Sequence, residues 1–218
     1  MKFKIGGRMS RNLDAYPGRT GTMMRLARKT LGDGVVLYAD ANGSYNSRKA
    51  IEVGRMLEDL GCRFFEEPCP WEEKMETKRV ADALKIPIAF GEQDSSLPLF
   101  QWMIDNKVID IVQFDLNYNG GFTRSARVAR MARAAGLTVV PHNTQTGATA
   151  AYMLQFASAT PNIGPYMEYP WRAPEKAQSW YTPNLRIENG KVKVPTGPGL
   201  GLEFDPAFLN KAAKVEAC

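Results

Sequence analysis

The chain has 218 residues, of which 44% are hydrophobic, and it carries a formal net charge of +5. This length and composition predict a folded protein with a sizeable core and argue against intrinsic disorder. No apolar run approaches the roughly 18 residues that a membrane helix needs. The N-terminus lacks the apolar centre of a signal peptide. We therefore expect no membrane partner.

The excess of basic residues does not indicate a nucleic-acid-binding protein. Lysine and arginine are scattered along helical stretches, as at Arg124 and Arg127, which is typical of a solvated helix face. We therefore expect no nucleic-acid partner. The cysteines are odd in number and contain no CxxC pair: Cys62, Cys69 and Cys218. This pattern favours a reduced, cytoplasmic setting over a disulfide framework.

Short apolar runs recur along the chain, and segments with helical spacing lie between them. We predict strands at Phe3–Ile5, Val35–Ala39, Arg63–Phe65, Ile86–Phe90, Ile109–Phe114, Leu137–Val140 and Ile163–Met167. Helical patterns cover 47–60, with Ser47 as the N-cap, and 125–135, and each ends at a glycine. Strands that alternate with helices predict parallel pairing, because each crossover helix returns the chain to the same end of the sheet.

Two α/β architectures fit this alternation, a doubly wound sheet and a (β/α)8 barrel. No GxGxxG follows a strand, which weakens the doubly wound, nucleotide-binding interpretation. Because only seven strands are found, we predict an incomplete TIM-type barrel that starts at about its second strand. Residues 1–170 are expected to form this catalytic domain. Residues 171–218 are expected to form a C-terminal segment with a closing helix and a hairpin, signalled by Asn189-Gly190 within alternating residues 186–193.

Three acidic residues follow three successive strands at regular spacing. Asp40 and Glu66 are 26 residues apart, and so are Glu66 and Glu92. In a parallel barrel this places them at neighbouring strand ends on one rim, whereas alone each could be a helix cap or a loop charge. Carboxylates that converge repel one another unless a cation lies between them, and hard oxygen ligands favour Mg²⁺. Strand alternation lets only one of Glu66 and Glu67 point into the barrel mouth.

The next two units end in Asp115 and His142. A carboxylate and an imidazole on neighbouring strand ends can form a hydrogen bond, so we expect Asp115 to orient His142 and raise its pKa for proton transfer. The alternative is that His142 only packs in the core. Lys2 and Lys4 share one face of the first strand, where a lysine beside other cations can become a base. The alternative is a charged surface or edge strand.

These residues together resemble the enolase superfamily, and within it the mandelate racemase group. The matching motifs are Lys2-Phe3-Lys4, Asp40-Ala41-Asn42, Glu66-Glu67-Pro68, Gly91-Glu92, Asp115 followed by Gly120-Gly121, His142, Glu168 and the segment 199–203. The resemblance implies that Asp40, Glu66 and Glu92 bind Mg²⁺. It implies that Lys4 and His142 are acid/base catalysts on opposite faces, with Lys2 and Asp115 beside them. It assigns substrate contacts to Asn42 and Glu168.

The implied reaction is removal of the proton alpha to a carboxylate through an enediolate. We expect dehydration of a sugar acid to a 2-keto-3-deoxy acid, and the alternative is a racemase or epimerase of a 2-hydroxy acid. The family's capping domain and first barrel strand have no counterpart in this sequence, so we expect a C-terminal part of a longer enzyme that is often oligomeric. An inactive truncated barrel and a non-catalytic metal-binding module stay open as further alternatives.

Overall fold

The computed structural model describes residues 1–170 and 180–211. The chain divides into two compact units, Met1–His142 and Asn143–Cys218, which are described one at a time below. The domain boundary that the sequence predicts after residue 170 adjoins residues 171–179, which lie outside the described ones.

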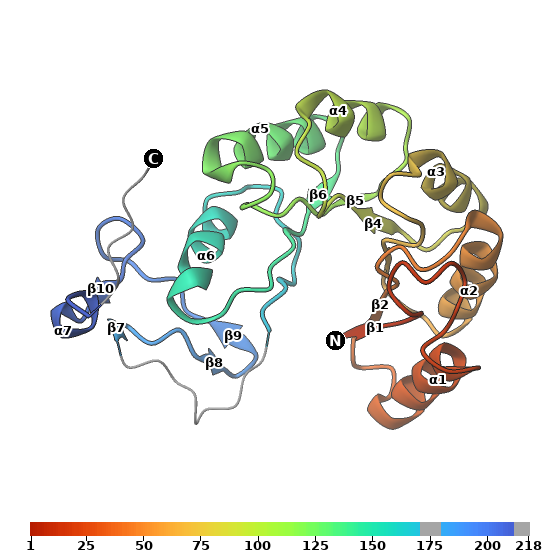
Figure 1. Cartoon of the computed structure of the whole chain (residues 1–218), viewed down its shortest axis with the longest axis horizontal. Helices are drawn as coiled ribbons and strands as arrows, with labels where there is room; N and C mark the ends of the chain where they lie inside the picture. Colours follow the sequence, from red (N-terminus) through yellow and green to blue (C-terminus); the bar gives the residue numbers. More distant parts are fainter. Residues whose placement is uncertain (171–179, 212–218) are drawn as a thin grey trace. The chain divides into compact units, whose positions relative to one another are not determined.

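The first unit is a parallel sheet with helices between its strands (Figure 1). Its strands are β1 (Lys2–Lys4), β2 (Tyr38–Asp40), β3 (Phe65–Glu66), β4 (Ile88–Phe90), β5 (Ile111–Val112) and β6 (Thr138–Val139). Its helices are α1 (Arg19–Leu31), α2 (Ser47–Asp59), α3 (Lys74–Ala83), α4 (Leu97–Asp105) and α5 (Gly121–Ala134). Six of the seven predicted strands are therefore present. The first is as long as its predicted run and begins one residue earlier, and the other five are shorter than their runs.

The order of the strands in the sheet distinguishes the two architectures. Each strand pairs in parallel with the next one in the sequence, from β1 to β6. A doubly wound sheet reverses its strand order at a switch point, whereas a barrel adds each new strand on the same side. In Figure 1 the helices follow the outer side of the curved row of strands. The α/β fold is therefore of the barrel type.

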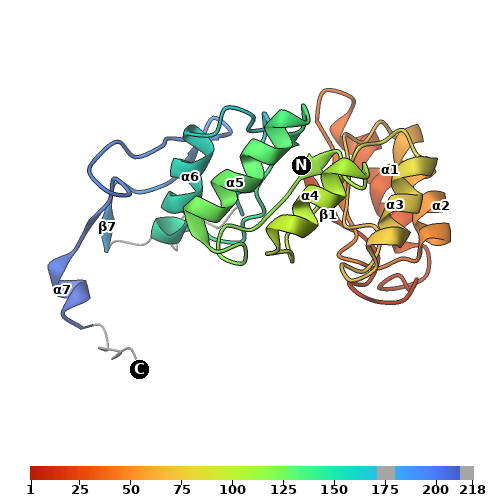
Figure 2. The same cartoon turned by 90° about the horizontal axis from the view of Figure 1, so that it is seen from above.

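The core of this unit lies between the sheet and its helices. Fully buried side chains such as Phe65, Leu57 and Ile88 come from strands and helices alike. Helices that are neighbours in the sequence also contact one another: α1 with α2, α2 with α3, and α4 with α5 (Figure 2). Burial of this apolar surface stabilises the unit and fixes the strand ends that carry the site.

Two helices begin earlier than the sequence predicts. The N-cap of α2 is Asn46 and not Ser47, because the Asn46 side chain accepts a hydrogen bond of 3.0 Å from the Lys49 backbone N–H. Helix α5 begins at Gly121 and not at Ser125. Its N-cap is Gly120 at φ 89°, a left-handed conformation that glycine adopts readily.

The second unit is smaller and contains short elements. They are a 3₁₀ helix (Gly147–Ala150), α6 (Ala151–Ser158), β7 (Tyr181–Thr182), β8 (Ile187–Glu188), β9 (Lys191–Val192), β10 (Glu203–Phe204) and α7 (Pro206–Leu209). The predicted hairpin is confirmed, since β8 and β9 pair antiparallel around Asn189-Gly190. The predicted strand Ile163–Met167 is wrong, because only Ile163 makes a single bridge. Gly164 and Pro165 follow, and proline cannot donate to a ladder.

No helix in residues 1–170 and 180–211 is long and apolar enough to cross a membrane.

Replacing a helical glycine by alanine is expected to have opposite effects on stability at Gly54 and at Gly21. A Cβ on Gly54 of α2 would lie 2.1 Å from Leu84 Cδ1 and 3.3 Å from Leu84 Cγ, whereas a Cβ on Gly21 of α1 would meet the flexible end of the Arg25 side chain and, at an ordinary contact distance of 3.7 Å, Met56 Sδ. We expect Gly54→Ala to lower the free energy of unfolding by about 1–2 kcal/mol through overpacking. Gly21→Ala should raise it by about 0.5–1 kcal/mol. Urea unfolding followed by circular dichroism measures both, and equal changes would contradict the packing against Leu84.

Candidate active site

The register of the first three strands places Lys4, Asp40 and Glu66 in one row. Lys4 pairs with Asp40 across β1 and β2, and Asp40 pairs with Glu66 across β2 and β3. Residues paired in a parallel sheet point to the same face. Each of the three is the last residue of its strand, so the row lies at the carboxyl-terminal ends of the strands, where barrel enzymes carry their active sites.

Two lysines neutralise the buried carboxylates of this row. Lys2 Nζ lies 2.7 Å from Glu66 Oε1 and 3.2 Å from Asp40 Oδ2, and Lys4 Nζ donates to the same Asp40 oxygen. Asp40 and Glu66 are both fully buried. Burial alone would raise the pKa of Asp40, but the ammonium groups of Lys2 and Lys4 outweigh it and lower that pKa. Both lysines therefore contact the buried carboxylates of this row, Lys2 with a side chain that is 13% exposed and Lys4 with one that is 53% exposed.

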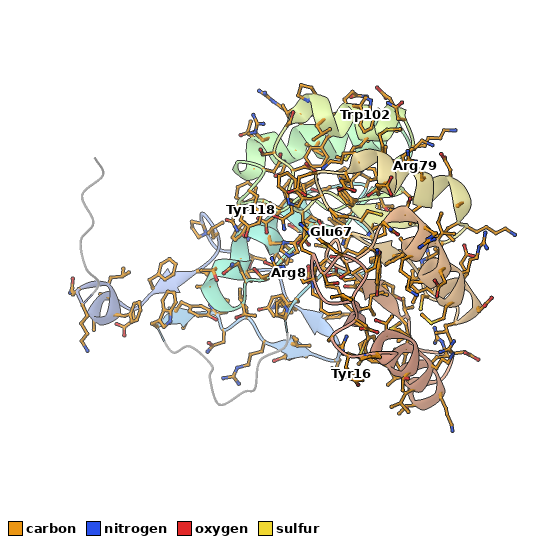
Figure 3. The ribbon with its side chains drawn as sticks, turned by 45° about the vertical axis from the view of Figure 1, so that its right-hand side comes forward. Arg8, Tyr16, Glu67, Arg79, Trp102 and Tyr118 are labelled. Carbon is orange, nitrogen blue, oxygen red and sulfur yellow. The ribbon has the colours of Figure 1, made fainter. Side chains whose placement is uncertain are left out.

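Glu67 is a second buried carboxylate beside the row, which the alternation of strand side chains did not predict. It leaves the strand geometry at φ 40° and is only 4% exposed. Burial, and then repulsion from the carboxylates of Glu92 and Asp40, raises the pKa of Glu67 to about 8. Asn42, at φ 43°, donates its backbone N–H to Asp40 Oδ1 at 2.9 Å and a side-chain hydrogen bond to Glu67. Figure 3 shows Glu67 towards the middle of the unit, whereas Arg79 and Trp102 lie on outer helices.

His142 lies between two carboxylates at the other end of the sheet. Its Nδ1 is 2.8 Å from Asp115 Oδ2, and its Nε2 is 3.4 Å from Glu92 Oε2. An isolated parallel bridge pairs the backbones of Asp115 and His142 just beyond β5 and β6. All three side chains are buried, so solvent screens these contacts little. The predicted hydrogen bond between Asp115 and His142 is present.

The hydrogen bonds around Asp115 favour its charged form. Burial raises its pKa, but the bond to His142 and the backbone N–H groups of Tyr118 and Asn117 outweigh burial, so the pKa lies below its usual value. This carboxylate therefore stays ionised at neutral pH and attracts the Nδ1 proton of the imidazole.

The shift predicts a pH-dependent stability. The pKa of Asp115 is lower in the folded protein than its unfolded value of about 3.9. The ionised carboxylate therefore makes its full contribution to the free energy of unfolding well above pH 4, and this contribution is lost as the pH falls through the folded pKa. We expect Asp115→Asn to lower the free energy of unfolding by about 1–2 kcal/mol at pH 7. The difference from the wild type should shrink as the pH falls below about 4. Denaturant titrations across this range measure it, and a constant difference would contradict the shift.

The carboxylates have the donor chemistry of a site for a hard divalent cation. Asp40, Glu66 and Glu92 offer only oxygen, and the buried Oε2 of Glu92 and Oε1 of Glu67 have no hydrogen-bond partner within the described structure. In residues 1–170 and 180–211, no three histidine, cysteine, aspartate or glutamate side chains form a ready-made metal cluster. Lysine and imidazole groups contact the carboxylates instead. The residues present fit Mg²⁺ by their chemistry and burial.

Glu168, the remaining predicted site residue, belongs to the second unit. Its carboxylate accepts a hydrogen bond of 3.0 Å from the backbone N–H of Asn143, and its carbonyl accepts one of 3.1 Å from the Asn143 side chain. Within this unit Glu168 therefore holds the residue that follows His142 in the chain.

One buried ion pair near the row was not predicted from the sequence. Lys74 Nζ lies 3.0 Å from Asp94 Oδ1, and the two side chains are 9% and 3% exposed. Asp94 follows Glu92 by two residues, in Gly91-Glu92-Gln93-Asp94, so it could have been suspected. Lys74 gave no such signal, because a lysine at the start of a helix is usually solvated.

The fold and site define an α/β protein of the barrel type with acidic and basic residues at its strand ends. Residues 1–208 match the model of the family described as enolase C-terminal domain-like. The chain therefore belongs to the enolase superfamily, and several of its structural relatives come from the mandelate racemase group.

Curated relatives include sugar-acid enzymes. The chain is 32% identical to arabinonate dehydratase of Saccharolobus solfataricus over 82% of its own length and 47% of that protein. It is 32% identical to D-galactarolactone cycloisomerase of Agrobacterium fabrum over 96% of its length and 55% of that protein. The chain thus spans about half the length of the curated relatives it matches.

Solved structures also match nearly all of this chain and little more than half of their own chains. A protein of Roseobacter denitrificans, described provisionally as a racemase, shares 42% identity with a TM-score of 0.90, over 96% of this chain and 58% of that one. A mandelate racemase/muconate lactonizing protein of Paracoccus denitrificans, complexed with magnesium, shares 30% identity with a TM-score of 0.86, over 98% and 57%.

Proposed function

We propose that the protein is a Mg²⁺-dependent hydro-lyase that removes the proton alpha to a carboxylate of a sugar acid and yields a 2-keto-3-deoxy acid. The observation that carries this proposal is His142, held by Asp115 on one ring nitrogen and facing Glu92 with the other. Relatives named as dehydratases of arabinonate, gluconate and galactonate support this reaction class.

Asp40, Glu66 and Glu92 would hold the cation, because they are buried oxygen donors at neighbouring strand ends. A bound divalent cation would neutralise the negative charge that develops on the substrate carboxylate as the alpha proton leaves.

In this proposal, side chains of the protein itself transfer the protons. The Asp115 carboxylate accepts the Nδ1–H of His142, which leaves Nε2 to take or deliver a proton. Lys4, at the far end of the sheet on β1, is the second acid/base group, and Lys2 lies beside it on the same carboxylate. In dehydration one group removes the alpha proton and the other protonates the departing beta hydroxyl. Water leaves, and the resulting enol becomes the keto acid.

The remaining parts of the proposal concern substrate contacts and setting. Asn42 lies beside Asp40 and Glu67, where it can reach a substrate bound at the row, and Glu168 is assigned to the substrate carboxylate. We also propose a homo-oligomer and a cytoplasmic location, and the free, buried Cys62 and Cys69 accord with a reducing compartment.

A racemase or epimerase of a 2-hydroxy acid is the second candidate function. It uses the same two groups, with one removing the alpha proton and the other returning a proton to the opposite face. The likeness to the Roseobacter denitrificans protein favours it.

A substrate panel separates the two reactions. The protein is incubated with Mg²⁺ and a set of sugar acids and 2-hydroxy acids in D₂O. A keto product that reacts with semicarbazide, and is absent after chelation, is expected for dehydration. Inverted product with deuterium at C2 and no keto acid would replace dehydration by racemisation. If no acid exchanges its alpha proton while Mg²⁺ binds, the proposed function is wrong.

A further inference from the structure

Lys74 is buried at the centre of a cluster that the proposed proton transfers do not use, in which Phe90 and Asp94 are also buried and Trp71 is 39% exposed. Its ammonium nitrogen lies 3.0 Å from Asp94 Oδ1, 4.9 Å from the centre of the Phe90 ring and 5.5 Å from the centre of the Trp71 ring. It also donates a hydrogen bond to the Trp71 carbonyl. A desolvated cation with aromatic faces and a carboxylate around it is held in one place.

These contacts join two connections, one that follows the proposed metal ligand Glu66 and one that carries the proposed ligand Glu92. Trp71 belongs to the connection from β3 to α3, which begins just after Glu66, and Lys74 is the first residue of α3. Asp94 belongs to the connection from β4 to α4, two residues after Glu92. Lys74 therefore bridges the segment after Glu66 and the segment that contains Glu92.

The turn that carries Glu92 is fixed at both of its ends. At its start, Gly91 has φ 123°, and a Cβ there would lie 2.9 Å from the Phe100 ring, so the backbone packs closely against α4. The Asp94 backbone N–H then closes the turn on the Gly91 carbonyl at 3.2 Å. The ion pair with Lys74 anchors its far end. Glu92 thus sits on a short turn with little freedom to move.

We propose that Lys74 is a positioning residue, which, through Asp94, sets the orientation of Glu92 relative to Glu66 so that both carboxylates reach one Mg²⁺. This inference rests on the proposed function, since it concerns the affinity of the same metal site. Outer contacts that orient ligands typically change metal affinity by about 10- to 100-fold when they are removed.

The test measures Mg²⁺ affinity by calorimetry and thermal stability in chelator, with no assay of activity. Lys74→Met keeps the aliphatic stem and removes the charge. Lys78→Met is the matched control, because Lys78 lies on the same helix and pairs with Asp82 at the surface. We expect the Mg²⁺ dissociation constant to rise at least about 10-fold in Lys74→Met and to change less than about twofold in Lys78→Met.

A double variant separates positioning from stability. Lys74→Met leaves the Asp94 charge buried without its partner, which should lower the melting temperature. Lys74→Met with Asp94→Asn removes that charge as well, so stability should recover while the Mg²⁺ affinity stays weak. This variant also keeps the test open if Lys74→Met does not fold.

The outcomes distinguish the inference from the function on which it rests. Wild-type affinity in the double variant would overturn the positioning role and leave the proposed function standing. If the unaltered protein binds no Mg²⁺, the metal assignment in the proposed function fails, and the positioning role fails with it.

Discussion

Replacement of Glu92 by glutamine is expected to abolish Mg²⁺-dependent turnover. The change keeps the shape of the side chain and removes the charge of a carboxylate that is 4% exposed and lies 3.4 Å from His142 Nε2. A metal ion supplies several kcal/mol of transition-state stabilisation, and each 1.4 kcal/mol is about tenfold in rate, so we expect a loss of at least about 100-fold. Calorimetry should show weaker Mg²⁺ binding in parallel.

The control for this change is Glu72→Gln, which makes the same substitution at an exposed glutamate in the connection after β3. It should leave Mg²⁺ binding and turnover unchanged. If Glu92→Gln binds Mg²⁺ as the unaltered protein does, Glu92 is not a ligand, even if turnover falls.

Replacement of His142 by asparagine is expected to lower turnover by about 10²- to 10⁴-fold, the usual contribution of a general acid or base. Asparagine can still form a hydrogen bond with Asp115 but cannot carry the proton that Nε2 exchanges. Because Asp40, Glu66 and Glu92 are unchanged, Mg²⁺ affinity should stay close to that of the unaltered protein. The measurements are steady-state kinetics and deuterium incorporation at the alpha carbon.

The exchange experiment tests the two-sided arrangement. With His142 replaced, exchange that depends on His142 should stop, while exchange that depends on Lys4 should continue. The variant Lys4→Met should give the complementary loss. Unchanged turnover and exchange in His142→Asn would leave His142 with a packing role only.

The sequence predicted the parts of this site that depend on the strand period. Equal spacing of Asp40, Glu66 and Glu92 indicated one βα unit per interval, and the sheet order agrees with that interpretation. The structure places Lys4 and Asp40 opposite each other, as a parallel register allows. The hydrogen bond between Asp115 and His142 followed from the same logic, because neighbouring strand ends lie side by side.

The features that the sequence did not predict depend on tertiary contacts. Alternation excluded one of Glu66 and Glu67 from the interior, but the backbone turns to a positive φ at Glu67 and both side chains are buried. Lys74 lies in a helix rich in charged residues, and only folding shows that it packs between aromatic rings. The apolar residues of 163–167 suggested a strand, but Gly164-Pro165 interrupts it, and the structure has no strand there.

The register of β1, β2 and β3 also affects how this protein can change during evolution. The strands place the ionic row, so the connections at the opposite ends of the strands carry no part of it. One such connection runs between α1 and β2, where a side chain on Gly34 would meet no atom within 4 Å. Mutations can accumulate there under weak selection. The connections at the carboxyl-terminal ends lie beside the charged row and are constrained by it. New substrate preferences would therefore arise by changes in those loops while the charged row stays the same.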